Sequence, residues 1–246
     1  MFNLDFVSFL LQKTNPMKFI LSSLLFLILS TAGSLFAQKP SGEGKKVFVF
    51  KIDEDIDPGM NRRVKLALEK AVEATADLII IEMDTYGGAV NDADDIRTMI
   101  LESAIPIYVF INKDAASAGA LISIATDSIY MAPGASIGAA TVVNGTDGAA
   151  APDKYQSYMR SMMRSTAEAK GRDPRIAEAM VDEKIKIDGI TEEGSVITFS
   201  VSEAMNYGFC DGEFDSIDEI LLAQNLQNAE IIDYQEDQIE QIIAFF

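Results

Sequence analysis

The sequence predicts an α/β fold built on a largely parallel sheet, and three observations support this prediction. Short runs rich in β-branched and aromatic residues alternate with segments whose apolar residues recur at helical spacing. The runs at 78–83 (LIIIEM) and 107–111 (IYVFI) are apolar enough to be strands buried on both faces, as strands of parallel sheets are. Helical segments separate successive strands, which is the order that βαβ crossovers produce.

The elements follow one another after a polar linker at 38–45, which is rich in Gly, Ser and Pro. The first strand is expected at 47–52 (VFVFKI), and Pro58 lies near the start of the first helix, where its missing N–H is harmless. Ser216 and Glu219 form a capping box before a late helix. The spacing of apolar residues predicts this first helix at 60–76 and further helices at 91–103, 118–125, 155–170 and 174–181.

The composition excludes several kinds of chemistry. The chain has 246 residues, a formal net charge of −18, no histidine and one cysteine. Without an imidazole there is no Ser-His-Asp triad, no Cys-His pair and no histidine-bound zinc. One cysteine, Cys210, excludes an intrachain disulfide framework. A strongly acidic chain without a basic block argues against nucleic-acid binding, because phosphate contacts need clustered Lys and Arg.

The N-terminal segment 1–37 is expected to be a targeting signal. Lys13 and Lys18 precede an uncharged apolar run that begins at Phe19, and the small residue Ala37 provides a cleavage site. The same run is long enough to cross a bilayer if it is retained as an anchor. Both alternatives place the rest of the chain outside the cytoplasm.

Two loops follow consecutive strands, at the sheet edge where reactive groups of α/β proteins gather. The first contains the pair Gly87–Gly88, and the second contains Ser117 directly before an apolar helix. A hydroxyl beside unpaired backbone N–H groups is the minimum layout for acyl transfer. Taken singly, the glycines could only form a tight turn and Ser117 could only be a helix N-cap.

Three ordered motifs carry a resemblance to a known family. The strings MDTYGGAVNDADDIRTMI, INKDAASAGALISIATDSIYMAPGASIGAATVV and ITFSVSEAMNYGFCDG resemble the NfeD-type membrane-bound serine proteases of the ClpP class, which are partners of stomatin-like proteins. The similarity covers about 47–215. It implies an α/β fold of the ClpP/crotonase type, in which ββα units form a spiral.

The resemblance also implies which residues act. The nucleophile of the family falls on Ser117 and its general base on Lys154, with an oxyanion hole formed by Gly87, Gly88 and Ala118. The absence of histidine fits this dyad, because a lysine can serve as the base when desolvation lowers its pKa. Lys113 lies nearer to the serine in sequence but adjoins an aspartate, so we expect it to be solvated. No cofactor or metal is expected, since the acidic residues near these loops, Asp84, Asp92, Asp94 and Asp95, fit strand ends and helix N-termini.

The predicted function is that of an exported serine endopeptidase. By resemblance it cleaves apolar segments of membrane-associated, stomatin-like proteins through an acyl-enzyme, associates with a membrane, and forms a homodimer or a larger homo-oligomer. Two alternatives stay open: a catalytically quiet scaffold partner of stomatin-like assemblies, and a protease similar to signal-peptide peptidases. An acyl-CoA enzyme of the crotonase type is a third, which export disfavours because CoA thioesters are cytosolic.

The expected organisation has four parts. Residues 1–37 are the signal peptide or N-terminal anchor, 38–45 the linker, and 46–215 the ClpP-class protease domain. Residues 216–246 are expected to form a C-terminal helical tail, and the transmembrane region that follows in many members of this family is expected to be absent. A flexible loop is expected from Asn144 to Pro152, just before Lys154, where its order would control assembly of the dyad.

Overall fold

The computed structural model describes residues 41–145, 147–191 and 194–235. The expected signal peptide or anchor at 1–37 and the end of the expected tail at 236–246 lie outside the described residues. The elements below therefore belong to the expected protease domain and to the part of the tail that directly follows it.

A sheet of eight strands forms the centre of the described chain. Its strands are β1 (Lys46–Ile52), β2 (Leu78–Thr85), β3 (Ile107–Ala116), β4 (Ser128–Met131), β5 (Ser136–Gly138), β6 (Thr198–Ser200), β7 (Gly212–Glu213) and β8 (Glu230–Asp233). The main order is β6-β5-β3-β2-β1-β8, and β4 pairs with β3 and β7. The named strand pairs are parallel except β5 with β6, so the predicted parallel α/β pattern is confirmed.

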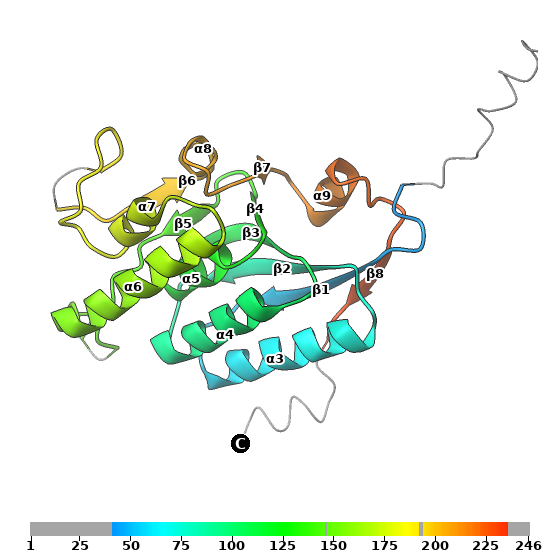
Figure 1. Ribbon diagram of the computed structural model, residues 1–246, viewed down its shortest axis with the longest axis horizontal. Helices are drawn as coiled ribbons and strands as arrows, with labels where there is room; N and C mark the ends of the chain where they lie inside the picture. The colour runs from blue at the N-terminus through cyan, green and yellow to red at the C-terminus, as the bar shows by residue number, and fades with distance from the viewer. Residues whose placement is uncertain (1–40, 146, 192–193, 236–246) are drawn as a thin grey trace, which may run out of the picture. The chain divides into compact units, whose positions relative to one another are not determined.

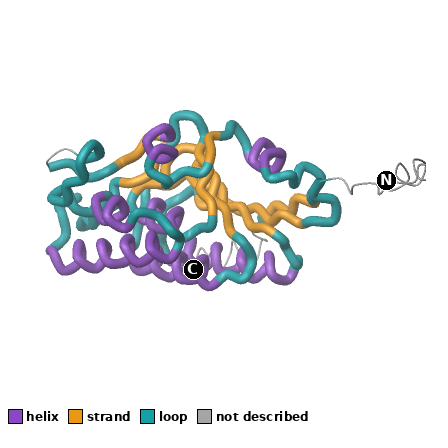
Figure 2. Tube along the Cα trace, turned by 45° about the horizontal axis from the view of Figure 1, so that its top comes forward, coloured by secondary structure: helices purple, strands orange, loops and turns teal. Residues whose placement is uncertain are grey.

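Helices cover both faces of this sheet unequally. The helices are α3 (Pro58–Glu73), α4 (Val90–Glu102), α5 (Ala118–Ile124), α6 (Asp153–Ala169), α7 (Pro174–Ala179), α8 (Val201–Asn206) and α9 (Ile217–Ala223). The long helices α3, α4 and α6 lie together on one side of the strands, and α9 lies on the other (Figures 1 and 2). Asp57 caps α3 by accepting a hydrogen bond from the Met60 N–H at 2.8 Å, and Pro58 occupies its first turn as expected.

The buried residues form two clusters, one on each face of the sheet, because successive side chains of a strand point to opposite faces. Phe48, Phe50 and Ile52 of β1 point into the large cluster, together with residues of α3 to α7. Val47 and Val49 point the other way, into a small cluster that Ile220 and Leu221 of α9 cover. Successive strand side chains face opposite sides of a sheet, so a continuous apolar run such as VFVF fills both clusters at once.

β3 changes its neighbour partway along its length, and this change positions the candidate site. Its first half pairs with β4 through Tyr108 to Ile111, and its second half pairs with β5 through Asp114 to Ala116. On its other side the register with β2 shifts between Met83 and Thr85, where β3 contains extra residues. Such bulges bend a strand and re-aim the side chains beyond it. The bend carries the end of β3 toward the Gly87–Gly88 loop.

Several elements differ from the sequence-based expectation. β3 runs on to Ala116, although the apolar run that predicted it ends at Ile111. The short strands β4 to β7 were not predicted, because each has four residues or fewer and too little periodicity to detect. The expectation of a helical tail after residue 216 is wrong for Glu230–Asp233, which forms β8 and pairs with β1. The capping bond from the Glu219 N–H to the Ser216 hydroxyl is present at 3.4 Å.

The described helices are short or polar by membrane standards. Within residues 41–145, 147–191 and 194–235, none combines the length and the apolar character needed to cross a bilayer.

A buried arginine closes the C-terminal end of α5. The side chain of Arg172 is 6% exposed, and its Nη1 donates to the carbonyl oxygens of Ile124 and Thr126, both at 3.1 Å. Burial lowers the pKa of this guanidinium, an effect that nearby Asp211 and Asp127 oppose. A cation at this position satisfies carbonyls that the helix leaves unpaired and interacts favourably with the helix dipole.

Replacing Arg172 with methionine removes both hydrogen bonds and keeps most of the buried volume. We expect the free energy of unfolding to fall by about 2–4 kcal/mol, because two buried carbonyls lose a charged donor. Urea unfolding followed by circular dichroism measures this change. The matched control is Arg62→Met at an exposed position of α3, which should cost less than about 0.5 kcal/mol. Equal losses in the two variants would contradict the role given to Arg172.

Candidate active site

Ser117 occupies a strained position between β3 and α5. Its backbone has φ 54° and ψ −114°, in the left-handed half of conformational space that non-glycine residues rarely adopt. Its N–H donates to the Gly138 carbonyl of β5 at 2.9 Å, and its own carbonyl accepts from Ala120 and Leu121. Such a conformation costs about 1–3 kcal/mol and persists only where the surrounding structure enforces it.

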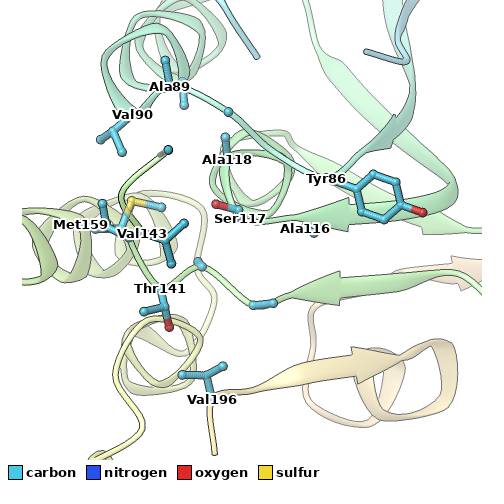
Figure 3. A pocket seen from close by; sticks show the side chains of 16 residues that line it. Tyr86, Ala89, Val90, Ala116, Ser117, Ala118, Thr141, Val143, Met159 and Val196 are labelled. Atoms are coloured by element: carbon cyan, nitrogen blue, oxygen red, sulfur yellow. The ribbon is translucent and has the colours of Figure 1, made fainter. Parts of the chain in front are cut away.

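The hydroxyl of Ser117 does not cap the helix that it precedes. Although Ser117 is the N-cap residue of α5, its side chain makes no capping hydrogen bond. In Figure 3 the hydroxyl points toward the space between Ala118, Val143 and Met159. The simple interpretation of this serine as an N-cap whose hydroxyl satisfies its own helix is therefore wrong.

The Gly87–Gly88 loop lies directly against Ser117. A Cβ on Gly87, which has φ 110°, would stand 2.6 Å from the Ser117 Cβ. A Cβ on Gly88, which has φ 154°, would stand 2.1 Å from the carbonyl oxygen of Ile56. Ile56 also holds the loop by two hydrogen bonds, from its N–H to the Gly87 carbonyl at 2.8 Å and from the Ala89 N–H to its carbonyl at 2.7 Å. The glycines are thus required by close backbone approach as well as by the turn.

The backbone amides near Ser117 differ in their availability. The Gly87 N–H donates to the Thr85 hydroxyl at 3.1 Å. Within the described part of the chain, the amides of Gly88 and Ala118 donate no comparable hydrogen bond, and Ala118 is the first residue of α5, where N–H groups lack a helical acceptor. Of the three residues predicted to form an oxyanion hole, Gly88 and Ala118 have unengaged amides and Gly87 does not.

A cavity of about 700 Å³ opens beside Ser117. Its walls come from the glycine loop and α4, from the start of α5, from 139–143 after β5, and from α6 through Met159 (Figure 3). Every lining residue is uncharged, and most are apolar or small. Tyr86 stands at the mouth, 79% exposed, with its ring pointing away from the cavity. The cavity is therefore an uncharged and largely apolar space beside Ser117.

Lys154 is not brought to Ser117 in this structure. It lies exposed in the first turn of α6, outside the cavity lining, with its ammonium group 4.6 Å from the centre of the Tyr155 ring. Lys113 is exposed, as expected, and forms an ion pair with Asp84 at 3.5 Å, which was not predicted. No lysine of the described residues lines the cavity.

The acidic residues near the loops have protein partners. Asp94 accepts two hydrogen bonds from Arg97 and one from the Tyr158 hydroxyl of α6 at 2.9 Å. This bond raises the pKa of Tyr158, because it favours the protonated phenol. Asn61 of α3 donates to Asp92 and Asp95, both at 3.0 Å. These carboxylates join α3 and α6 to α4.

Sequence reasoning missed the residues that support the site from behind. Ile56, Thr85 and Gly138 fix the loop and the Ser117 backbone, and Gln156 of α6 bonds to the cavity wall. Most of these contacts join residues that lie far apart in the sequence, and the strand β5 that ends at Gly138 is too short to detect from a pattern. A Cβ there would stand 2.3 Å from the Ile197 carbonyl.

Gly88→Ala tests whether the close approach of this loop matters. Gly134→Ala is the matched control, because Gly134 also has a positive φ, of 83°, but a Cβ added there would meet nothing within 4 Å. We expect the control to lose about 1 kcal/mol of unfolding free energy and the Gly88 variant at least about 2 kcal/mol more, since Ile56 must move. Chemical denaturation of both variants gives the comparison. Similar losses would show that the loop has room to relax.

Comparison with known proteins places this architecture in a family. Residues 46–234 match the model of the NfeD1b N-terminal domain. The membrane protein NfeD1b of Bacillus subtilis is 35% identical over 190 residues, which are 77% of this chain and 43% of that protein. The membrane-bound protease PH1510 of Pyrococcus horikoshii is 29% identical over 206 residues, 81% of this chain and 44% of that protein. The chain therefore spans less than half the length of these two relatives.

Solved structures give the same assignment. Two are variants of the 1510-N membrane-bound stomatin-specific protease, one with a serine replaced by alanine and one with a lysine replaced by alanine, the latter in complex with a substrate peptide. Both are 25% identical to this chain, with TM-scores of 0.69 and 0.70; they cover 78% and 82% of this chain, and this chain covers 99% and 97% of theirs. ClpP1 of Listeria monocytogenes shares the fold at 20% identity and a TM-score of 0.53, over 70% of this chain and 94% of its own. The resemblance carried by the three motifs is confirmed, and this chain belongs to the NfeD1b N-terminal domain family, with a ClpP-like fold.

Proposed function

We propose that this chain is a serine endopeptidase in which Ser117 is the nucleophile. The observation that carries the proposal is the Ser117 hydroxyl, which is free of its helix, held in a strained turn and directed into a cavity beside two unengaged amides. The relation to PH1510, named as a membrane-bound protease, supports a protease over the other chemistries that the fold can host.

The proposed reaction forms and then hydrolyses an acyl-enzyme. The Ser117 Oγ attacks the carbonyl carbon of the scissile peptide bond while a general base takes its proton. The amides of Gly88 and Ala118 donate hydrogen bonds to the oxygen that becomes negative in the tetrahedral intermediate. The base then returns the proton to the leaving amine, and a water molecule repeats the sequence to release the acyl group.

Lys154 is the proposed base. In the related 1510-N protease, the serine and the lysine that were each replaced by alanine lie 41 positions apart. Lys154 lies 37 positions after Ser117, and the next lysine along the chain, Lys170, is engaged by Asp127 at 2.7 Å. Because Lys154 is exposed in the structure, the first turn of α6 must rearrange to bring it into the cavity. An amine that leaves water for an apolar cavity favours its neutral form, which a base requires.

The proposed substrates are apolar segments of membrane-associated, stomatin-like proteins. The uncharged cavity lining supports the apolar preference, and the stomatin specificity for which the 1510-N relatives are named supports the stomatin-like partner. We further propose that the chain acts on the extracytoplasmic side of a membrane, as the N-terminal segment suggests, and that it assembles as a homodimer or larger homo-oligomer. Val143 lines the cavity and is exposed, so it is available to contact either a substrate or a second copy.

A second candidate function is a catalytically quiet scaffold that binds stomatin-like partners. The exposed position of Lys154 favours it, because a binding cavity needs no general base. The two functions share the apolar cavity and differ in whether Ser117 and Lys154 turn over a bound peptide.

Cleavage assays with Ser117→Ala and Lys154→Ala distinguish these functions. The purified chain is incubated with casein and with an apolar peptide that has the sequence of a stomatin-like tail, and products are followed by mass spectrometry. We expect each variant to lose at least about 100-fold in kcat/KM, because a nucleophile or a general base is removed.

Lys113→Ala is the matched control for the lysine variant. It removes another exposed lysine near the site, one that is paired with Asp84, and should leave cleavage within about twofold of the parent. Activity that survives in the Ser117 and Lys154 variants would overturn the dyad. Peptide binding without cleavage by the parent chain would establish the scaffold.

A further inference from the structure

A small hairpin forms one wall of the Ser117 cavity. We use the term wall hairpin for residues 142–145 and 147–151. The Ala151 N–H donates to the Val142 carbonyl at 2.9 Å and the Asn144 N–H to the Ala149 carbonyl at 2.8 Å, so the two arms run antiparallel. Val142, Val143 and Gly145 line the cavity. Most of the hairpin is exposed, and few hydrogen bonds hold it, so its position depends on what fastens its base.

The side chain of Gln156 fastens that base. Its Oε1 accepts a hydrogen bond from the Val142 N–H at 3.0 Å. Its Nε2 donates to the Val142 carbonyl at 2.7 Å and to the Ala151 carbonyl at 3.2 Å. One amide group therefore engages both arms and pairs with Val142 through a donor and an acceptor, as a residue of a neighbouring strand would.

Gln156 belongs to the helix that carries the proposed base. It lies in the first turns of α6, two residues after Lys154, and Met159 of the same helix lines the cavity. Farther along α6, the Tyr158 hydroxyl bonds to Asp94 of α4. The Tyr158 bond attaches α6 to another helix, whereas the hydrogen bonds of Gln156 attach the start of α6 to the backbone of the wall hairpin.

We propose that Gln156 is a positioning residue that fastens the wall hairpin to the start of α6, so that the hairpin and this part of α6 move together when Lys154 is brought into the cavity. This role in the reaction rests on the proposed function, whereas the fastening itself does not. A primary amide is required because Val142 presents both an N–H and a carbonyl. Methionine is of similar length and offers neither a donor nor a comparable acceptor, and a glutamate carboxylate would accept from Val142 but face two carbonyl oxygens without a proton to donate.

Hydrogen exchange tests the fastening directly. In Gln156→Met, the Val142 amide loses its acceptor, and we expect it to exchange at least about 10-fold faster than in the parent chain. The Ala140 amide donates to the Met180 carbonyl at 2.7 Å and should keep its rate, which would show that the segment directly after β5 is intact. Gln224→Met is the matched control, because it removes another glutamine that bonds through its amide, to the Tyr130 hydroxyl at 3.0 Å.

Gln156→Glu adds a test of the donor requirement. At neutral pH the carboxylate should leave the hairpin as loose as in Gln156→Met. Acidification protonates the carboxyl, and we then expect much of the protection of the Val142 amide, measured relative to its intrinsic exchange rate, to return. Gln156→Met should show no such recovery. A destabilised or misfolded variant would lose protection at Ala140 as well and would not recover on acidification.

Peptide cleavage measures the consequence for the proposed reaction. We expect Gln156→Met to lower kcat about 10-fold, with a smaller change in KM, because the defect lies in placing the base more than in binding. The inference is overturned if the Val142 amide exchanges as in the parent, or if cleavage in an active parent is unchanged relative to Gln224→Met. A parent chain that shows no cleavage counts against the proposed function, while the exchange data still decide whether Gln156 fastens the hairpin.

Discussion

The close contact between Gly87 and Ser117 is the constraint on which the site depends. The Gly87 backbone lies where any side chain would collide with the Ser117 Cβ, and Ser117 itself is held in a left-handed conformation by its bond to Gly138. Gly87 limits the space on one side of Ser117, and Gly138 holds the Ser117 backbone by a hydrogen bond. In this arrangement the hydroxyl faces the cavity and does not cap α5. Strain of this kind persists only where the surrounding structure enforces it, and it supports the role proposed for Ser117.

The fold creates this contact by bending one strand. β3 pairs first with β4 and then with β5, and its extra residues opposite Met83 and Thr85 turn its end toward the glycine loop of β2. Behind the site, Ile56 holds the loop, and Arg172 satisfies the far end of the helix that follows Ser117. Arg172 therefore fixes the C-terminal end of α5, and the bond from the Ser117 N–H to the Gly138 carbonyl fixes the residue from which α5 starts.

The main strands and helices, the two loops and the family could be predicted from the sequence, because apolar runs, periodic apolar residues and glycine pairs are clear local signals. The sequence was insufficient where a position depends on distant partners. The Thr85 hydroxyl accepts a hydrogen bond from the Gly87 amide, and β8 pairs with β1 from the end of the described chain. No local sequence pattern predicts either contact. The outward placement of Lys154 has the same origin, since it depends on where α6 lies against α4, to which the Tyr158 hydroxyl attaches it.

Covalent labelling tests most directly whether the strained turn makes Ser117 a reactive nucleophile. The chain is treated with an alkyl fluorophosphonate, which reacts with activated serine hydroxyls, and the adduct is located by peptide mass spectrometry. We expect a single adduct at Ser117, formed faster in the parent chain than in Lys154→Ala and absent after unfolding in urea. No adduct at Ser117 in the folded chain, or labelling spread over other serines, would contradict this role.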